Sequence, residues 1–185
     1  MIISFNGDFG SGKSTIAKRM ATALNFEHYY MGQILRDLAA KRGMTLVELL
    51  QSGETDPSVD QDIDKIVKEL GKTKDNFLIE SRTAWYFIPQ SLKIYLKVDE
   101  REGAKRIFKE LKQENQRNED SGLTTIEAVL ESNRRRRATD RKRYQEYYGI
   151  DPLVMDNYDF VLDTTNLSIE EVFSRTMDFV LSKMK

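Results

Sequence analysis

Residues 2–14 read Ile-Ile-Ser-Phe-Asn-Gly-Asp-Phe-Gly-Ser-Gly-Lys-Ser, and this stretch decides the fold. Its apolar start, Ile2–Phe5, is bounded by Asn-Gly and predicts a short buried strand. The following residues, Gly7–Ser14, match the pattern G-x-x-x-x-G-K-[ST] at every required position. Apolar residues then recur at helical spacing as far as Leu24, which predicts a helix. A glycine-rich turn between a strand and a helix is the context that a phosphate-binding loop requires.

Each part of this motif has a physical task. Glycines allow the backbone to curl so that successive N–H groups point at phosphate oxygens. The helix that follows adds the positive end of its dipole. We expect Lys13 to reach the β- and γ-phosphates of ATP, and the Ser14 hydroxyl to ligate Mg²⁺. The residues expected to hold the nucleotide are Gly7, Asp8, Phe9, Gly10, Ser11, Gly12, Lys13, Ser14 and Thr15.

The rest of the chain alternates between strand-like and helix-like segments. Further strands are predicted at 77–79, 92–98 and 160–162. Helices are predicted at 34–41, 46–52, 59–70, 101–114 and 125–148, with a last one capped by Ser168. Gly71 is expected to end the third of these helices as a C-cap. This alternation predicts an α/β fold, with a parallel sheet flanked by helices in one domain of 185 residues.

Two segments exceed what the sheet itself needs. The helices between the first strand and residue 77 are longer than one crossover between parallel strands requires. We therefore expect an inserted substrate-binding unit at about 31–72. The polar stretch 115–122 lacks apolar periodicity, so a short lid is expected at about 112–125.

The composition excludes several classes of protein. The formal net charge of −1 gives no general attraction to nucleic acid or to membranes. The chain has no cysteine, which rules out disulfides and thiolate zinc sites and fits a cytosolic setting. No stretch approaches the roughly 20 apolar residues of a membrane span. We expect a cytoplasmic protein, monomeric by default, that binds neither nucleic acid nor a membrane.

A phosphate loop serves kinases, GTPases and mechanical ATPases alike. GTPases carry an Asn-Lys-x-Asp motif that reads guanine, and this motif does not occur in the sequence. Motor and transport ATPases are usually larger. A small chain with an inserted helical unit favours a kinase that acts on a small molecule.

Arginines with the setting of a phosphate site stand in three places. Phosphoryl transfer depends mainly on positioning and charge stabilisation, and the planar guanidinium suits phosphate. Arg36 falls in the first turns of a helix after Gly32. Arg82 follows the strand at 77–79, at the edge of the sheet where α/β proteins bind ligands. Glu80 beside it has two open interpretations: a role in the water shell of Mg²⁺, or a salt bridge with an arginine.

The third place is the basic run Arg134–Arg143. On a helix, Arg136, Asp140 and Arg143 share one face, at i, i+4 and i+7. Two arginines that donate hydrogen bonds, on either side of a carboxylate that accepts them, suit the binding of a nucleotide. The run also fits a solvated helix face. A nucleic-acid patch is a further reading, weakened by the near-neutral total charge and the lack of interleaved aromatic residues.

These segments, together with three others, resemble a known family. They look like the cytidylate kinases (CMP/dCMP kinases), especially the short archaeal-type form. The resemblance covers nearly the whole chain, in the family's order, and its motifs are Gly32-x-x-Leu-Arg36, Arg42-Gly-Met-Thr-Leu46, Glu80-Ser-Arg82 with Ala84-Trp85, Asp140-x-x-Arg143-Tyr144, Tyr148-Gly-Ile-Asp151 and Asn157–Thr164.

The resemblance implies the fold of the nucleoside monophosphate kinases, in which a core binds ATP, a helical insertion binds the monophosphate and a lid closes. It implies transfer of the γ-phosphoryl of MgATP to CMP or dCMP, giving ADP and CDP or dCDP. Residues that match Arg36, Arg82 and Arg143 contact CMP in the family. Positions that match Arg136 and Asp140 meet its nucleoside part, and Gly32 belongs to the same substrate-binding set.

Lid arginines stabilise the transferring phosphoryl in the family, and Arg106 and Arg117 are the candidates here. The chain also departs from the family pattern. Met31 stands where a small Ser or Thr is more frequent, and Gly103 where a lid-helix arginine is frequent. Arg137 and Ala138 stand in place of acidic residues. These departures bear on base and sugar preference more than on the reaction.

Two conspicuous side chains are expected to be structural. His28 is the only histidine, and a phosphate acceptor is already a nucleophile, so no general base is required. Trp85 is expected to pack in the core.

Two alternatives remain open at this point. One is a kinase for another small acceptor, such as UMP, AMP or a non-nucleotide like shikimate. The Gly-Phe-Pro-Arg segment of adenylate kinases is absent, which argues against AMP. The other is a nucleotide-binding, RNA-associated protein that uses Arg134–Arg143 as a patch.

Overall fold

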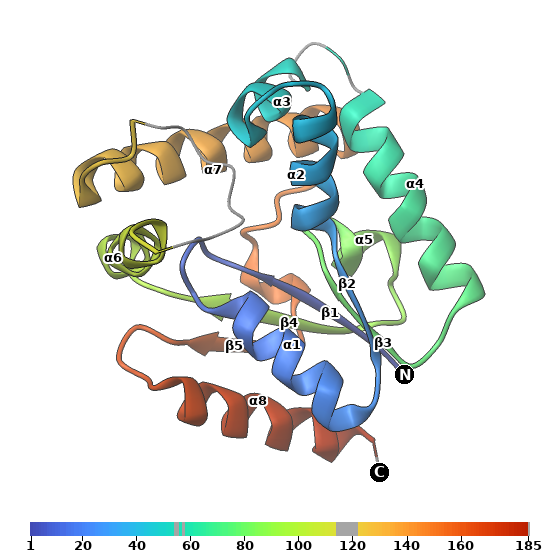
Figure 1. The fold of residues 1–185 in the computed structure, drawn as a ribbon. Coiled ribbons are helices and arrows are strands. Elements are labelled where there is room, and N and C mark those ends of the chain that lie inside the picture. Colours follow the sequence, from blue (N-terminus) through green and yellow to red (C-terminus); the bar gives the residue numbers. More distant parts are fainter. Residues whose placement is uncertain (54–55, 57, 114–121, 185) are drawn as a thin grey trace.

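A single five-stranded parallel sheet organises the molecule (Figure 1). The computed structural model describes residues 1–53, 56, 58–113 and 122–184. The strand order is β2-β3-β1-β4-β5, and every neighbouring pair runs parallel. The strands are β1 (Ile2–Gly7), β2 (Glu27–Tyr30), β3 (Phe77–Glu80), β4 (Leu92–Lys97) and β5 (Phe160–Asp163).

Helices cover both faces of the sheet (Figure 1). They are α1 (Lys13–Leu24), α2 (Met31–Lys41), α3 (Leu46–Ser52), α4 (Ser58–Thr73), α5 (Ala84–Phe87), α6 (Glu100–Leu111), α7 (Ile126–Tyr148) and α8 (Ile169–Lys183). Helices α1 and α8 pack on one face, while α2, α4 and α5 pack on the other. Helices α6 and α7 pack on each other through Ala104, Ile107 and Val129. Among the described residues, no helix has the length and apolar character needed to cross a membrane.

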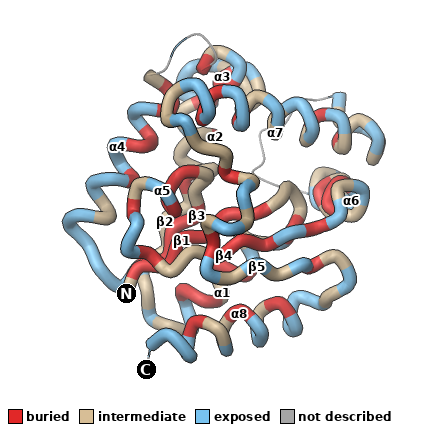
Figure 2. Tube along the Cα trace, turned by 180° about the vertical axis from the view of Figure 1, so that it is seen from behind, coloured by how far each residue is buried: buried red, intermediate tan, exposed pale blue. Residues whose placement is uncertain are grey.

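Strand β3 shows why the strands are continuously apolar rather than alternating. Leu78 faces the layer of α1 and α8, whereas Phe77 and Ile79 face α4 and α5. All three side chains are fully buried. A parallel sheet covered on both faces has this pattern, and Figure 2 shows the buried strands running through the centre of the molecule.

Most predicted elements are confirmed, with ends shifted by a few residues. The helix at 46–52 has the predicted bounds, and Thr125 and Ser168 cap α7 and α8 through their side chains. The expected α/β class with a parallel sheet is confirmed. The helix predicted at 101–114 ends at Leu111, and residue 114 lies outside the described part of the chain.

Two details of the prediction are wrong. The segment taken as the second strand is the third, because Glu27–Tyr30 forms the edge strand β2, a polar stretch that no apolar pattern marks. Gly71 does not cap α4, which continues to Thr73. A β-carbon on Gly71 would lie 2.8 Å from a side-chain carbon of Ile88, so this glycine lets α4 pack closely against Ile88.

Close approach of two backbones fixes α6 against the glycine-rich loop. A β-carbon on Gly103 would lie 2.3 Å from the Phe9 carbonyl oxygen, and one on Gly10 would lie 2.2 Å from the Gly103 carbonyl oxygen. No side chain fits at either position without moving backbone. This contact explains why a glycine stands at 103.

The substitution Gly103→Ala tests this contact, because its effect on helix propensity and its effect on the tertiary contact change stability in opposite directions. Alanine gains about 1 kcal/mol in helix propensity, but forcing a methyl against backbone costs about 1–3 kcal/mol or more. We expect a lower free energy of unfolding in urea. Gly122→Ala is the matched control, since nothing lies within 4 Å of its β-carbon position. A more stable Gly103→Ala protein would show that α6 does not depend on this approach.

Candidate functional site

The predicted phosphate loop opens onto a large cavity. Gly10 and Gly12 have positive φ angles of 77° and 82°, so the backbone curls between β1 and α1 as the motif requires. The cavity of about 1080 Å³ lies at the carboxyl ends of the strands, where parallel sheets bind ligands. Residues 10–15 line one end of it. This volume exceeds that of a typical single-ligand pocket, about 300–1,000 Å³.

The opposite end of the cavity is built by helices far along the chain. Helix α2 contributes Arg36, α4 contributes two aspartates, and α7 contributes Arg136 and Asp140. The apolar wall there consists of Leu46, Leu50, Ile63 and Tyr144. The fold therefore joins the phosphate loop to the segment predicted as a substrate-binding insertion.

Ser14 is held by a buried carboxylate. Its Oγ donates to Glu80 Oε2 at 2.6 Å, and Glu80 Oε1 lies 2.8 Å from His28 Nε2. Glu80 is almost fully buried, at the carboxyl end of β3. Of the two interpretations left open for Glu80, the contact with Ser14 supports the one that involves Mg²⁺. His28, which was expected to be structural, contacts Glu80 and lines the cavity.

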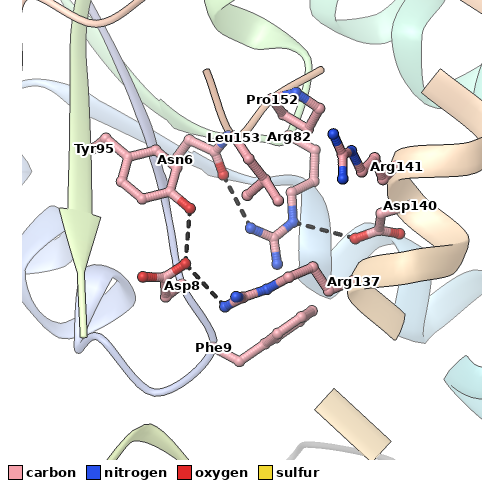
Figure 3. Close-up of a pocket in the computed structure, with 10 residues that line it drawn as sticks. All are labelled: Asn6, Asp8, Phe9, Arg82, Tyr95, Arg137, Asp140, Arg141, Pro152 and Leu153. Atoms are coloured by element: carbon pink, nitrogen blue, oxygen red, sulfur yellow. Dashed lines mark hydrogen bonds and ion pairs between the residues drawn. The ribbon is translucent and has the colours of Figure 1, made fainter. Parts of the chain in front are cut away.

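Arg82 links the loop strand to α7 (Figure 3). Its Nη1 donates to Asn6 Oδ1 at 3.0 Å and to the Gly7 carbonyl at 2.6 Å. Its Nε lies 3.4 Å from Asp140 Oδ2. The Arg82 guanidinium is thus held between the start of the phosphate loop and helix α7.

Phe9 supports the guanidinium groups beside the loop. The Arg82 guanidinium carbon lies 4.6 Å from the centre of the Phe9 ring, and that of Arg136 lies 4.7 Å from it. Cation–π contacts of this kind are attractive, and they bring two positive charges to one edge of the cavity. Phe9 was predicted as one of the loop residues that hold the nucleotide, and nothing in its sequence context marks this contact with the two arginines.

Asp8 anchors the loop to the sheet and to α7 (Figure 3). Its carboxylate accepts hydrogen bonds from Tyr95 Oη (2.8 Å), the Val98 backbone N–H (3.0 Å) and Arg137 Nη2 (3.0 Å). Burial and the neighbouring Asp8 charge raise the pKa of Tyr95, which therefore remains a neutral donor. Arg137 also pairs with Glu100, so α7 is tied to the start of α6.

Gly32 and Arg36 share one partner. A β-carbon on Gly32 would lie 2.6 Å from the Tyr30 ring, so glycine lets α2 start against this side chain without displacing it. Arg36 Nη1 donates to the Tyr30 hydroxyl at 3.0 Å, and its side chain lines the cavity. Both predicted residues therefore line the cavity.

Arg143 does not line the cavity, although it was predicted to contact the acceptor. It is 1% exposed. Its Nε lies 2.9 Å from Asp60 Oδ2, its Nη2 donates to Asp140 Oδ1 at 3.0 Å, and its Nη1 donates to the Leu50 carbonyl at 2.9 Å. Arg143 thus sits behind two carboxylates that do line the cavity.

Three further arginines of the run Arg134–Arg143 are paired with carboxylates. Arg134 and Arg137 pair with Glu100, and Arg141 pairs with Asp151. Arginines that are paired with carboxylates favour neither hypothesis for this run, nucleic-acid binding or a helix face that is solvated throughout.

The two predicted lid arginines have different outcomes. Arg106 lies on α6 and lines the cavity, and its Nη2 donates to the carbonyls of Thr164 and Thr165 at 3.0 Å each. Its role in transfer stays a prediction. Arg117 and most of the lid at 112–125 lie outside the described residues.

Sequence reasoning missed Asp60 and Asp64, one helical turn apart on α4. Both are nearly fully buried and line the cavity. Asp64 Oδ1 accepts from Thr83 Oγ1 at 2.6 Å. Burial raises the pKa of Asp64, and burial raises the pKa of Asp60 to about 6 against the opposing effect of Arg143. A signal existed: both stand on the apolar face of α4, with Val59, Ile63 and Val67.

Trp85 is a core residue, as predicted. It packs with Tyr95 and Tyr158, and its Nε1 donates to the Arg82 carbonyl at 2.9 Å. This contact holds the backbone that carries Arg82.

A P-loop that shares one cavity with arginines and buried carboxylates, on a five-stranded parallel sheet, defines a phosphotransferase of the P-loop kinase class. The sequence profile of the cytidylate kinase-like family matches residues 2–166, and the chain belongs to this family. The family resemblance inferred from the sequence motifs is thereby confirmed.

Curated relatives match over nearly their whole length. The cytidylate kinase of Pyrobaculum neutrophilum is 34% identical, over 100% of this chain and 95% of its own. The cytidylate kinase of Methanocella arvoryzae is 36% identical, over 94% of this chain and 93% of its own.

Solved structures show the fold. An uncharacterized protein from Eubacterium ventriosum superposes with a TM-score of 0.71 at 14% identity, covering 98% of this chain and 99% of its own. Shikimate kinase from Acinetobacter baumannii superposes with a TM-score of 0.60 at 15% identity, covering 98% and 93%. At such low identity these similarities show the fold alone.

The substitution Asp64→Asn tests the cost of burying this carboxylate. Its folded pKa lies above the ordinary value of 3.8, so the folded protein holds the proton more tightly than the unfolded chain. Wild-type stability therefore falls as pH rises from the unfolded pKa through the folded pKa. The amide keeps an acceptor for Thr83 and does not ionise.

We expect the variant to gain stability relative to wild type between about pH 4 and about pH 7.5, measured by urea unfolding at both values. If the stability difference between Asp64→Asn and wild type stays constant, or shrinks as pH rises, the pKa of Asp64 is not raised by folding. Asp62→Asn on the exposed side of α4 is the control and should show no such gain.

Proposed function

We propose that the protein transfers the γ-phosphoryl group of ATP to CMP or dCMP, giving ADP and CDP or dCDP. One observation carries the proposal. In a chain of the cytidylate kinase-like family, the phosphate loop and an acceptor wall of arginines and carboxylates face each other across one cavity. The two substrates can therefore meet with their phosphates between β1 and α7.

The donor half follows from the loop. Backbone N–H groups of residues 10–15 and the N-terminus of α1 stabilise the negative charge of the triphosphate. Lys13 lines the cavity and supplies the cation for the β- and γ-phosphates. The amides act on the charge that builds up on the leaving ADP, which is where electrostatic stabilisation lowers the barrier.

The residues around Ser14 fit a Mg²⁺ ion. The Ser14 hydroxyl and the Glu80 carboxylate offer hard oxygen donors 2.6 Å apart. Mg²⁺ in phosphoryl-transfer sites takes few protein ligands and completes its shell with phosphate oxygens and water. When bound, Mg²⁺ would neutralise part of the charge of the triphosphate. Ser14 would hold it, and Glu80 would orient its water shell.

The acceptor half uses Arg36, Arg82, Arg136, Asp140 and the α2 start at Gly32. Arg82 stands nearest to the loop, through the Gly7 carbonyl, so we place the acceptor phosphate beside it. A phosphate oxygen of CMP attacks the γ-phosphorus, the bond to the β,γ-bridging oxygen breaks, and ADP leaves. The acceptor is already an anionic nucleophile, so no side chain has to remove a proton.

Closure of the site belongs to the same proposal. Water that reached the γ-phosphate would hydrolyse ATP, so a lid that excludes water favours transfer. We assign this role to the segment at about 112–125, with Arg117 and Arg106 as candidates to stabilise the transferring group. Arg143 supports the acceptor site through Asp60 and Asp140. We further propose that the enzyme works as a cytoplasmic monomer, which its mass in size-exclusion chromatography with light scattering would check.

The decisive experiment measures ADP release with MgATP and one of CMP, dCMP, UMP, AMP or GMP. We expect turnover with CMP or dCMP, and a loss on the order of a hundredfold or more in Lys13→Ala, because a cation that stabilises the transferring phosphates is removed. Lys65→Ala, an exposed lysine of α4, is the matched control and should keep full activity. Absence of turnover with both cytidine nucleotides would overturn the proposal.

The Mg²⁺ assignment has its own test. In Glu80→Gln the charge beside Ser14 is lost while the shape is kept, and outer-shell partners of this kind are worth about 10–100-fold in metal affinity. We expect the Mg²⁺ concentration at half-maximal rate to rise by about that factor at saturating ATP and CMP. Glu69→Gln, exposed on α4, is the control. An unchanged Mg²⁺ dependence would remove Glu80 from this role.

A further inference from the structure

Phe9 belongs to the phosphate loop, but its ring contacts arginines that we assign to the acceptor. The guanidinium carbons of Arg82 and Arg136 lie 4.6 Å and 4.7 Å from the centre of this one ring. All three residues line the cavity. Two positive charges beside one another repel, whereas the negative face of an aromatic ring attracts each of them. The ring therefore offsets the repulsion that would otherwise move the two arginines apart.

The Phe9 ring is itself held in place by α6 and α7. Its backbone is confined, because a β-carbon on Gly103 of α6 would lie 2.3 Å from the Phe9 carbonyl oxygen. Its side chain is partly buried and packs on the apolar cluster of Ala104, Ile107 and Val129 between the two helices. A ring fixed in this way provides a rigid support for the guanidinium groups that contact it.

The other contacts of Arg82 hold its guanidinium and leave one nitrogen for a ligand. Nη1 donates to Asn6 Oδ1 and to the Gly7 carbonyl, and Nε lies 3.4 Å from Asp140 Oδ2. Among the described residues, no hydrogen bond or ion pair engages Nη2. An arginine side chain loses rotamer freedom when it binds a ligand, and contacts that immobilise it beforehand reduce this loss. The ring can thus raise the affinity for a ligand by acting through the arginines.

We propose that Phe9 is a positioning residue of the acceptor site, whose ring face holds the guanidinium groups of Arg82 and Arg136 in the geometry that receives the acceptor nucleotide. This inference rests on the proposed function. The phosphate loop then has two separable tasks: its backbone N–H groups bind the donor phosphates, and its one aromatic side chain orients cations for the acceptor. Weakening the negative face of the ring should raise the dissociation constant of CMP and leave that of ADP unchanged.

Two other roles of the ring predict different results. If Phe9 serves only as apolar packing on α6, the charge distribution of its ring has no effect on CMP binding. If the arginines have to leave the ring to reach the acceptor phosphate, a weaker cation–π contact would tighten CMP binding instead. The sign of the change therefore separates the three roles.

The experiment replaces Phe9 alone by a graded series of ring-fluorinated phenylalanines. Fluorine withdraws electron density from the ring face in steps and nearly keeps the shape of the ring, so it weakens the attraction for a cation and preserves the packing. The dissociation constants of CMP and of ADP are measured in separate calorimetric titrations, which require no turnover. We expect the value for CMP to rise stepwise, by about threefold to tenfold at the highest fluorine content, while the value for ADP stays constant.

Phe173 on α8 is the matched control. The Arg19 guanidinium carbon lies 4.4 Å from the centre of its ring, but neither residue is among the described residues that line the cavity. The same fluorinated series at Phe173 should leave both dissociation constants unchanged. It thus separates the position of the ring from any general effect of fluorine on an arginine–phenylalanine pair.

Phe9→Leu gives a second arm that does not depend on incorporation of the analogues. Leucine keeps an apolar side chain on α6 and removes the ring face, so we expect a similar rise for CMP, about threefold to tenfold, and none for ADP. A dissociation constant of CMP that stays the same or falls across the fluorinated series would overturn the inference. A parallel rise for ADP would also overturn it, because the ring would then support the whole loop. If wild type binds ADP but neither binds nor phosphorylates CMP, the proposed function fails instead.

Discussion

A chain of alternating charges connects the two halves of the site, and the geometry of both substrates depends on it. Arg82 bonds to the Gly7 carbonyl at the loop and pairs with Asp140 on α7. Arg143 then joins Asp140 to Asp60 on α4. Each ion is buried or half-buried, so each requires its neighbour to offset the cost of leaving water. Removal of one member would leave an uncompensated charge and shift the next.

The same contacts explain how the fold brings distant segments to one cavity. Parallel strands end at one edge of the sheet, which places the loop after β1 beside Glu80 and Arg82 after β3. Helix α7 crosses the acceptor end, and Arg137 ties it to Asp8 within the loop. Movement of α7 relative to the sheet would therefore change the geometry of the phosphate loop as well as that of the opposite end of the cavity.

Glycines and arginines have separate tasks in this arrangement. Gly10 and Gly103 allow two backbones to touch, and Gly32 allows α2 to start against Tyr30. Several arginines line the cavity itself, whereas Arg143 pairs with carboxylates from behind the cavity wall. The residue type alone does not distinguish these arginines, since both kinds carry the same charge.

The sequence by itself determined the phosphate loop, the α/β class, the family and most helices, because these follow from local pattern: a fixed spacing of glycines, one lysine and one serine, and periodic apolar residues. It also marked Arg36, Arg82, Arg136 and Asp140, which line the cavity. Only the tertiary structure decided that Glu27–Tyr30 is a strand, that Gly71 packs rather than caps, that Arg143 lies behind the site, and that Asp60 and Asp64 face it. Burial and pairing arise from contacts between segments far apart in the chain, and no local pattern contains that information.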